Sequence, residues 1–206
     1  MPIDASIFGN SSNFDARYIK DYDELARLTE HIKGVGLKVV LTSGSFDFYH
    51  LGHALYIEKA KEYGDVLIVG VDSDEKVRER KGLNRPLYPQ DERLRILVCQ
   101  RSVDIVTLKE LNSTKWLLIK IVRPDILIAT QETYSSEEID ELESEFCGKV
   151  VVLEPQAKTS TSSRLRDLNM ELATDIGDRL AERIPGLVQE VIDEAVGRHD
   201  KPKENS

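Results

Sequence analysis

The fold of this chain is decided by one stretch, which reads Leu41-Thr42-Ser43-Gly44-Ser45-Phe46-Asp47-Phe48-Tyr49-His50-Leu51-Gly52-His53. An apolar, β-branched run at 39–41 leads into it, and an amphipathic helical pattern at 54–63 follows it. A strand that enters a Gly/Ser turn and leaves as a helix presents backbone N–H groups at the helix start, and such groups bind phosphate. The stretch therefore predicts a phosphate-binding strand–turn–helix unit.

Two histidines lie where that helix begins. His50 and His53 are three residues apart, so they share one helix face. A lone histidine at a helix start is usually a capping or surface residue, but H-x-G-H directly after a strand and G-x-F-D is a more specific pattern. Imidazoles placed there can donate hydrogen bonds to a phosphorus centre that gains negative charge. We expect both to be catalytic.

The rest of the chain alternates between apolar runs and helical patterns. The patterns predict strands over 38–42, 66–71, 103–108, 126–129 and 149–153, and helices over 21–33, 53–63, 74–81, 114–122, 136–146 and 164–169, with one more opened by 89–92. This alternation favours a Rossmann-like, doubly wound α/β fold with a mostly parallel five-stranded sheet. Ligands of such sheets bind beyond the carboxyl ends of the strands.

We expect three parts in the chain. Residues 1–20 are polar and aperiodic and predict a flexible arm, 21–170 form the α/β domain, and 171–206 form a C-terminal helical extension and tail. The extension is helical over 173–198 with a break predicted near 184–186, where Pro185 is followed by Gly186. Its apolar stripe must be buried against the domain or against a second subunit.

Composition narrows the function. The chain has 206 residues, a net charge of −9 and two cysteines. Acidity argues against general nucleic-acid binding, no apolar run approaches the length of a membrane span, and the first residues do not resemble a signal peptide. Cys99 is expected in the core. These features favour a cytoplasmic protein. Residues 76–101 nevertheless carry a local charge of +5, which suits a small phosphorylated ligand, although Arg78 and Arg95 suit a solvated helix face better.

These motifs resemble those of a known family. The stretch 43–53 resembles the signature of cytidylyltransferase-like nucleotidyltransferases, and 64–74 together with 80–86 are similar to the adenylyltransferase domain of ADP-heptose synthases. Glycerol-3-phosphate cytidylyltransferase is a more distant likeness. The resemblance covers about 20–168, and it implies transfer of a nucleotidyl group, preferably AMP from ATP, to a phosphorylated small molecule such as a sugar phosphate, with release of pyrophosphate. Mg²⁺ is expected to arrive with the triphosphate, without a protein metal site, and a homodimer is expected.

The resemblance also assigns residues. His50 and His53 would contact the α-phosphate, and Lys81 and Arg85 would hold the acceptor phosphate, unless their segment is only a surface loop. Asp47 orients the turn or a ligand hydroxyl, or is an ordinary loop carboxylate. Arg93 reaches phosphate or braces the loop. The remaining residues expected at the nucleotide are Ser43, Gly44, Ser45, Phe46 and Gly52, with Thr161, Ser162 and Ser163 as the turn for the β- and γ-phosphates.

One segment departs from the family pattern. After the fourth strand, where the heptose enzymes show a lysine and glycines, this chain has Ala129-Thr130-Gln131. Because that region lines the nucleotide pocket in the family, cytidylyl transfer from CTP and a catalytically weak nucleotide-binding regulatory module remain as alternatives. A fragment of a tRNA synthetase, which shares this type of histidine motif, is disfavoured by the acidity of the chain and by the lack of a K-M-S-K-S-like segment.

Overall fold

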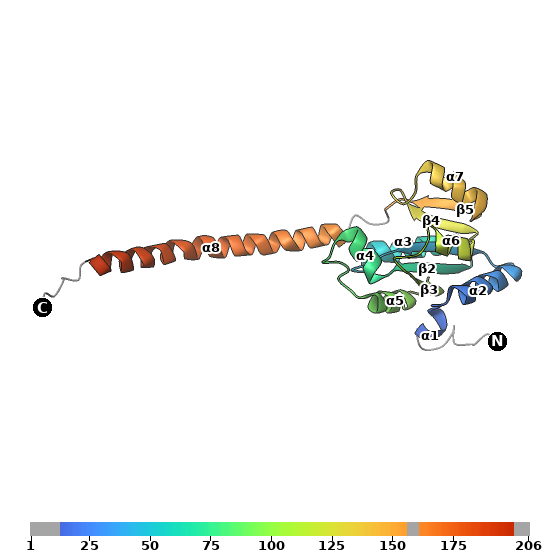
Figure 1. Ribbon diagram of the computed structural model, residues 1–206, viewed down its shortest axis with the longest axis horizontal. Coiled ribbons are helices and arrows are strands. Elements are labelled where there is room, and N and C mark those ends of the chain that lie inside the picture. Colours follow the sequence, from blue (N-terminus) through green and yellow to red (C-terminus); the bar gives the residue numbers. More distant parts are fainter. Residues whose placement is uncertain (1–12, 156–160, 200–206) are drawn as a thin grey trace. The chain divides into compact units, whose positions relative to one another are not determined.

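The computed structural model describes residues 13–155 and 161–199, and for 161–167 and 194–199 it describes the backbone only. The chain divides into two compact units, Met1–Thr161 and Ser162–Ser206. Figure 1 shows the first as a sheet covered by helices and the second as one long helix. The domain boundary expected at residue 170 therefore falls inside a helix.

The first unit contains five parallel strands in the order β3-β2-β1-β4-β5. Their bounds are β1 Val39–Gly44, β2 Val66–Asp72, β3 Ile105–Lys109, β4 Ile126–Thr130 and β5 Lys149–Leu153. This confirms the Rossmann-like, doubly wound sheet that the alternating pattern predicts. The central strands are apolar on both faces, as expected of a parallel sheet with helices on each side.

Helices cover both faces of this sheet. Buried side chains of α3 (Leu51–Lys61) and α5 (Gln90–Val98) pack on one face, and those of α2 (Tyr22–Gly34), α6 (Leu117–Val122) and α7 (Ser136–Glu145) pack on the other. α4 (Asp74–Lys81) follows β2. The caps explain several helix starts: Asp21 accepts from the Glu24 N–H, and Ser135 forms a capping box with Glu138.

The start of the described chain differs from the expected flexible arm, because residues 13–19 pack on the domain. α1 (Phe14–Arg17) is a single turn, and Tyr18 forms a parallel bridge with Val106 of β3. The Arg17 guanidinium donates to the carbonyl oxygens of Val98 at 2.7 Å and Asp104 at 3.1 Å, and also to that of Val103. Residues 1–12 lie outside the described residues.

Two further expectations need correction. Cys99 is exposed rather than buried, because α5 ends at Val98 and Cys99 lies one residue beyond its last core position. The second unit consists of α8 (Thr161–His199), a single helix of 39 residues that continues through Pro185 without the predicted break. A proline removes one N–H donor, but the hydrogen bonds of the neighbouring residues keep the helix continuous. No helix in the described part of the chain is long and apolar enough to cross a membrane.

Candidate active site

The carboxyl end of β1 is the point from which the site is built. β1 lies between β2 and β4, and the chain runs outward from it first to β2 and β3 and then, on the other side, to β4 and β5. Such a reversal is a topological switch point, where doubly wound sheets bind their ligands. The turn at 45–50 leaves β1 here and enters α3, as the opening stretch of the sequence predicts.

The two motif histidines lie together at the start of α3. His50 is the N-cap residue, and its Nδ1 accepts a hydrogen bond from the Gly52 N–H at 3.0 Å. A neutral His50 therefore carries its proton on Nε2. The ring centroids of His50 and His53 are 4.1 Å apart. The H-x-G-H spacing thus places two imidazoles side by side, with one tautomer fixed by the glycine between them.

His53 is held in a mostly apolar environment. Its ring lies 5.6 Å from both the Phe46 and Tyr49 rings, and its Nδ1 is buried with no hydrogen-bond partner among the described residues. Burial, reinforced by the charges of His50 and Lys81, lowers the pKa of His53 to about 4. His53 is therefore neutral at physiological pH, and its buried Nδ1 needs a partner that the described residues do not supply.

Asp47 organises the loop that follows α4. Its carboxylate is buried and accepts hydrogen bonds from the N–H groups of Leu87 at 2.8 Å and Tyr88 at 3.3 Å, while its other oxygen lies 2.7 Å from the Arg85 guanidinium. Of the roles considered for Asp47, this geometry supports orientation of the turn and its neighbouring loop. It also draws Arg85 against the turn rather than leaving it on a free surface loop.

Lys81 ends α4 and reaches the same turn. Its ammonium donates to the Ser45 hydroxyl at 2.8 Å. Partial burial lowers the pKa of Lys81, and the guanidinium groups of Arg80 and Arg85 lower it further. Two cations predicted to hold an acceptor phosphate, Lys81 and Arg85, are thus brought to one turn beside the histidines.

Arg93 is buried, with an exposed fraction of only 1%. Its guanidinium donates to the carbonyl oxygens of Tyr88 at 3.0 Å, Ser45 at 2.6 Å and Asp72 at 2.8 Å, and to the Asp74 carboxylate at 2.8 Å. These contacts assign Arg93 the second of the two roles considered for it, a brace of the loop. A direct contact with the nucleotide is disfavoured because the guanidinium already donates hydrogen bonds to groups of the protein.

The sequence interpretation missed two charged residues at this edge, Asp72 and Lys109. They end β2 and β3, and their side chains lie 3.5 Å apart, with Arg80 3.0 Å from Asp72. The Lys109 ammonium also donates to the Ser43 hydroxyl at 3.0 Å. Gly70 leaves room for the Lys109 side chain to reach Ser43, since a Cβ at position 70 would lie 2.9 Å from the Lys109 side chain. A charged residue that directly follows a buried apolar strand was the available signal.

The remaining predicted residues lie in or near the turn, apart from the last three. Phe46 is buried with a positive φ of 46°, and a Cβ on Gly44 would come within 3.3 Å of its ring. Thr161 to Ser163 form the first turn of α8, and their side chains lie outside the described residues. Their predicted contact with the β- and γ-phosphates remains a prediction.

The segment after β4 forms a hydrogen-bonded turn. The Thr130 N–H donates to the Thr133 hydroxyl at 3.1 Å, and the two hydroxyls are 2.8 Å apart. The Gln131 side-chain amide donates to Glu154 at 2.7 Å. Thr130 and Gln131, which stand where the family has a lysine and glycines, therefore form side-chain contacts within the protein.

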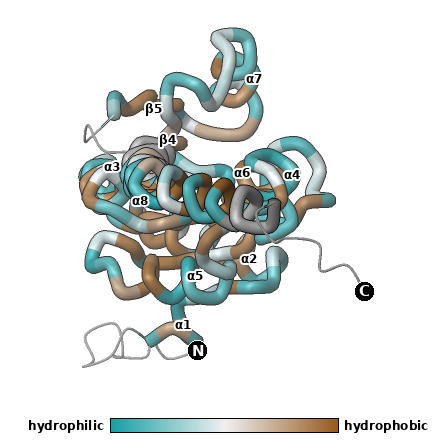
Figure 2. The backbone as a smooth tube through the Cα atoms, turned by 90° about the vertical axis from the view of Figure 1, so that its left-hand side faces the viewer, coloured by the Kyte–Doolittle hydropathy of each residue, from teal (hydrophilic) through white to brown (hydrophobic). Residues whose placement is uncertain are grey.

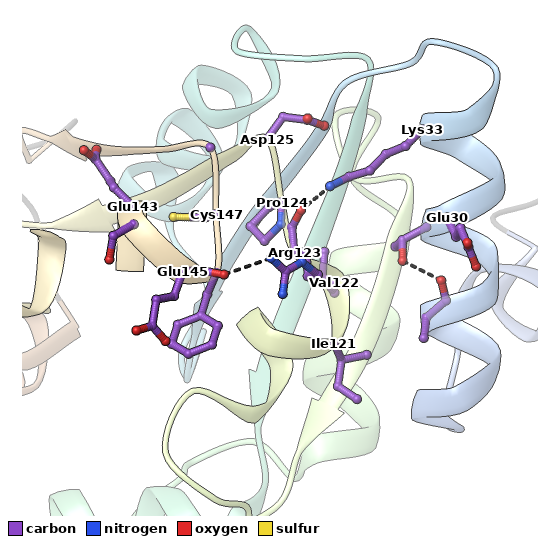
Figure 3. A pocket seen from close by; sticks show the side chains of 15 residues that line it. Glu30, Lys33, Ile121, Val122, Arg123, Pro124, Asp125, Glu143, Glu145 and Cys147 are labelled. Atoms are coloured by element: carbon purple, nitrogen blue, oxygen red, sulfur yellow. Dashed lines mark hydrogen bonds between the residues drawn. The ribbon is translucent and has the colours of Figure 1, made fainter. Parts of the chain in front are cut away.

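A hollow of about 560 Å³ lies elsewhere, lined by α2, α7 and the chain between α6 and β4. Figure 3 shows Lys33 and Arg123 pointing across it. Lys33 donates to the Arg123 carbonyl oxygen, and the Arg123 guanidinium donates to the Glu145 carbonyl oxygen at 2.9 Å. Because this hollow borders the residues that precede β4 and β5, it lies at the amino edge of the sheet, and its cations already satisfy carbonyl groups.

Comparison with known proteins identifies relatives of this chain. Bifunctional protein HldE of a Nitratiruptor species is 47% identical over 111 residues, which are 54% of this chain and 24% of that protein. HldE of Aliarcobacter butzleri is 32% identical over 164 residues, 80% of this chain and 34% of that protein. The chain thus spans about a quarter to a third of the relatives that it matches.

A solved structure shows the same fold. The lipopolysaccharide core biosynthesis protein from Thermoplasma volcanium superimposes with a TM-score of 0.52 at 25% identity, over 59% of this chain and 100% of that one. The parallel five-stranded sheet with helices on both faces is a Rossmann-like nucleotidyltransferase fold. The model of the cytidylyltransferase-like family matches residues 41–174, and the chain belongs to that family.

Proposed function

We propose that this protein transfers the adenylyl group of ATP to the phosphate of a phosphorylated sugar and releases pyrophosphate. The observation that carries the proposal is the pair His50 and His53, placed side by side at a helix start on the switch point of the sheet. Membership of the cytidylyltransferase-like family and the similarity to HldE proteins support it.

The reaction requires no nucleophile from the protein. An oxygen of the acceptor phosphate forms a bond to the α-phosphorus of ATP, and the bond between that phosphorus and the oxygen bridging to the β-phosphorus breaks, with its electron pair leaving on pyrophosphate. His50, through Nε2–H, and the neutral His53 donate hydrogen bonds to the α-phosphate oxygens as their charge grows. Such donors contribute roughly 10²–10³ in rate each. Positioning of the two substrates supplies much of the rest.

The cations of the turn hold the acceptor. Lys81 and Arg85 lie against Ser45 and Asp47, so the acceptor phosphate would enter next to the histidines with its charge balanced. Arg93 fixes the Ser45 carbonyl and the start of α4 and acts only through that placement. The backbone of the turn, with Ser43, Gly44 and Gly52, would approach the nucleotide.

Magnesium belongs to the proposal as a companion of the triphosphate. No group of three or more potential ligands from His, Cys, Asp and Glu gathers among the described residues. We expect the phosphate oxygens of the triphosphate to bind the ion. The ion would then offset part of the negative charge of the triphosphate. A cytoplasmic location and a homodimer complete the proposal; the two free cysteines, Cys99 and Cys147, suit a reducing compartment.

The test is pyrophosphate release by the full chain, with ATP, CTP, GTP or UTP and Mg²⁺, against a panel of sugar phosphates and alcohol phosphates. We expect release with ATP and a sugar phosphate, and its loss in His50→Ala and His53→Ala. His31→Ala, which removes an exposed histidine of α2, is the matched control. Release with CTP alone would favour the cytidylyltransferase, and ATP binding in thermal-shift assays without release on any acceptor would favour the regulatory module.

A further inference from the structure

The long helix α8 carries three parallel rows of side chains at intervals of four residues. The apolar row consists of Leu168, Leu172, Ile176, Leu180 and Ile184. One position before each of its last four members runs the charged row, which consists of Glu171, Asp175, Arg179 and Arg183. One position after runs the small row, which consists of Ala173, Gly177 and Ala181. Residues four apart are neighbours on a helix surface, so each row is continuous.

The apolar side chains of α8 are too exposed to be left in water. Ten large hydrophobic residues between Leu168 and Ile192 are 48–66% exposed. Figure 2, which looks roughly along α8, shows both hydrophobic and hydrophilic residues on this helix. Most helical stability in proteins comes from packing of an apolar face. A helix of this length spans roughly 58 Å at about 1.5 Å per residue, so its face calls for a long partner.

We propose that this face binds the same face of a second copy of the chain, with the two α8 helices antiparallel and crossing at Gly177. The inference does not depend on the proposed catalytic reaction. It rests on the order of charges along the charged row, which reads two acids followed by two arginines.

That order complements itself when one copy is reversed. In a two-fold antiparallel pair, a flank of one helix meets the same flank of its partner, and contacts are reciprocal. A two-fold axis at Gly177 places Glu171 opposite Arg183 of the second copy and Asp175 opposite its Arg179. Within one helix, Arg179 already lies 3.1 Å from Asp175, so Asp175 and Arg179 of the two copies would join into one four-charge network across the axis.

The same axis also brings the other two rows into register. Leu172 of one copy falls between Leu180 and Ile184 of the other, and Ile176 lies between its own counterpart and Leu180. The small row meets the small row, which lets the two backbones approach closely. A parallel pair would instead set the charged row against the small row and leave the ion pairs unmade.

The net charge of the helix disfavours a membrane surface as the occupant. Residues 161–199 contain eight carboxylates, five arginines and no lysine, for a net charge of −3. Helices that lie on membranes are rich in cations that attract anionic lipids.

Sedimentation of the full chain tests the apolar row. We expect a dimer for the wild type and a monomer for the double variant Ile176→Glu/Leu180→Glu. Thr174→Glu adds the same kind of charge on the opposite side of the helix and should remain dimeric. A monomeric wild type would overturn the proposal. A dimer that survives Ile176→Glu/Leu180→Glu with helicity unchanged would also overturn it, because the association would then come from the α/β domain.

A charge-swap experiment tests the orientation. Glu171→Arg/Asp175→Arg makes the charged row wholly basic, and Arg179→Glu/Arg183→Glu makes it wholly acidic. Each variant alone should dimerise at least about tenfold more weakly, since like charges face each other, while an equimolar mixture should recover a heterodimer. The control Asp178→Arg/Glu182→Arg changes as much charge on the far side and should have little effect. Failure of the mixture to recover, with both variants helical, would rule out the antiparallel pair.

Discussion

Replacing Arg93 by methionine should cost the domain about 3–5 kcal/mol of stability, the range for breaking a buried, paired charge. The guanidinium donates to three carbonyl oxygens and to the Asp74 carboxylate. A hydrogen bond to a charged group is worth about 1.5–3 kcal/mol, and methionine returns none of the four. Partial access of water to Asp74, whose side chain is 21% exposed, keeps the loss below the simple sum of the bonds.

Urea and thermal unfolding of the full chain measure this loss. At about 2–4 °C per kcal/mol for a chain of this size, the melting temperature should fall by roughly 6–20 °C. Arg101→Met, at an exposed arginine just beyond α5, is the matched control and should change stability by less than about 0.5 kcal/mol. If Arg93→Met melts like the wild type but binds ATP far more weakly, Arg93 contacts the nucleotide and its role as a brace is refuted.

Three further predictions concern the site itself. His50→Ala and His53→Ala should each lower turnover by roughly 10²-fold or more while the ATP dissociation constant stays nearly unchanged, because the donors act on charge that grows in the transition state; wild-type turnover in both would contradict their assignment. Lys81→Ala should raise the KM of the sugar phosphate far more than that of ATP, and equal effects would show that Lys81 touches the triphosphate or only orders its loop. Burial lowers the pKa of His53 from 6.5 to about 4. Between these pH values the unfolded chain binds the proton more readily than the folded chain, so the protein should lose stability as the pH falls from 6.5 towards 4. An NMR titration of the His53 ring with a midpoint near 6.5 would contradict this prediction.

The sequence predicted the layout of the domain well, because its strands are short apolar runs bounded by strong turn residues. The run 66–71, for example, differs from β2 by a single residue, Asp72. The H-x-G-H pattern also predicted where β1 ends and where α3 begins, since a strand followed by that motif determines both the edge of the sheet and the helix start. Local pattern is sufficient where strand, turn and helix are contiguous.

What the sequence could not give depends on distant contacts. Arg93 was open between two roles because its acceptors, Ser45 and Asp72, are 48 and 21 residues away in the chain. Lys109 reaches Ser43 only because β2 between them carries Gly70. The predicted break at Pro185 failed for the opposite reason, since a local helix-breaking signal was outweighed by the helical pattern on both sides.

The short bridge between Tyr18 and Val106 affects the tendency of this protein to aggregate. β3 is an outer strand of the sheet, and an outer strand presents unpaired N–H and C=O groups that other chains can join. Tyr18 and Ile19 cover it, with the Ile19 N–H donating to the Val106 carbonyl oxygen at 3.0 Å. A variant that begins at residue 20 would lack Tyr18 and Ile19 and would expose the outer edge of β3. The peptide before α2 therefore protects this edge from pairing with other chains and from aggregation.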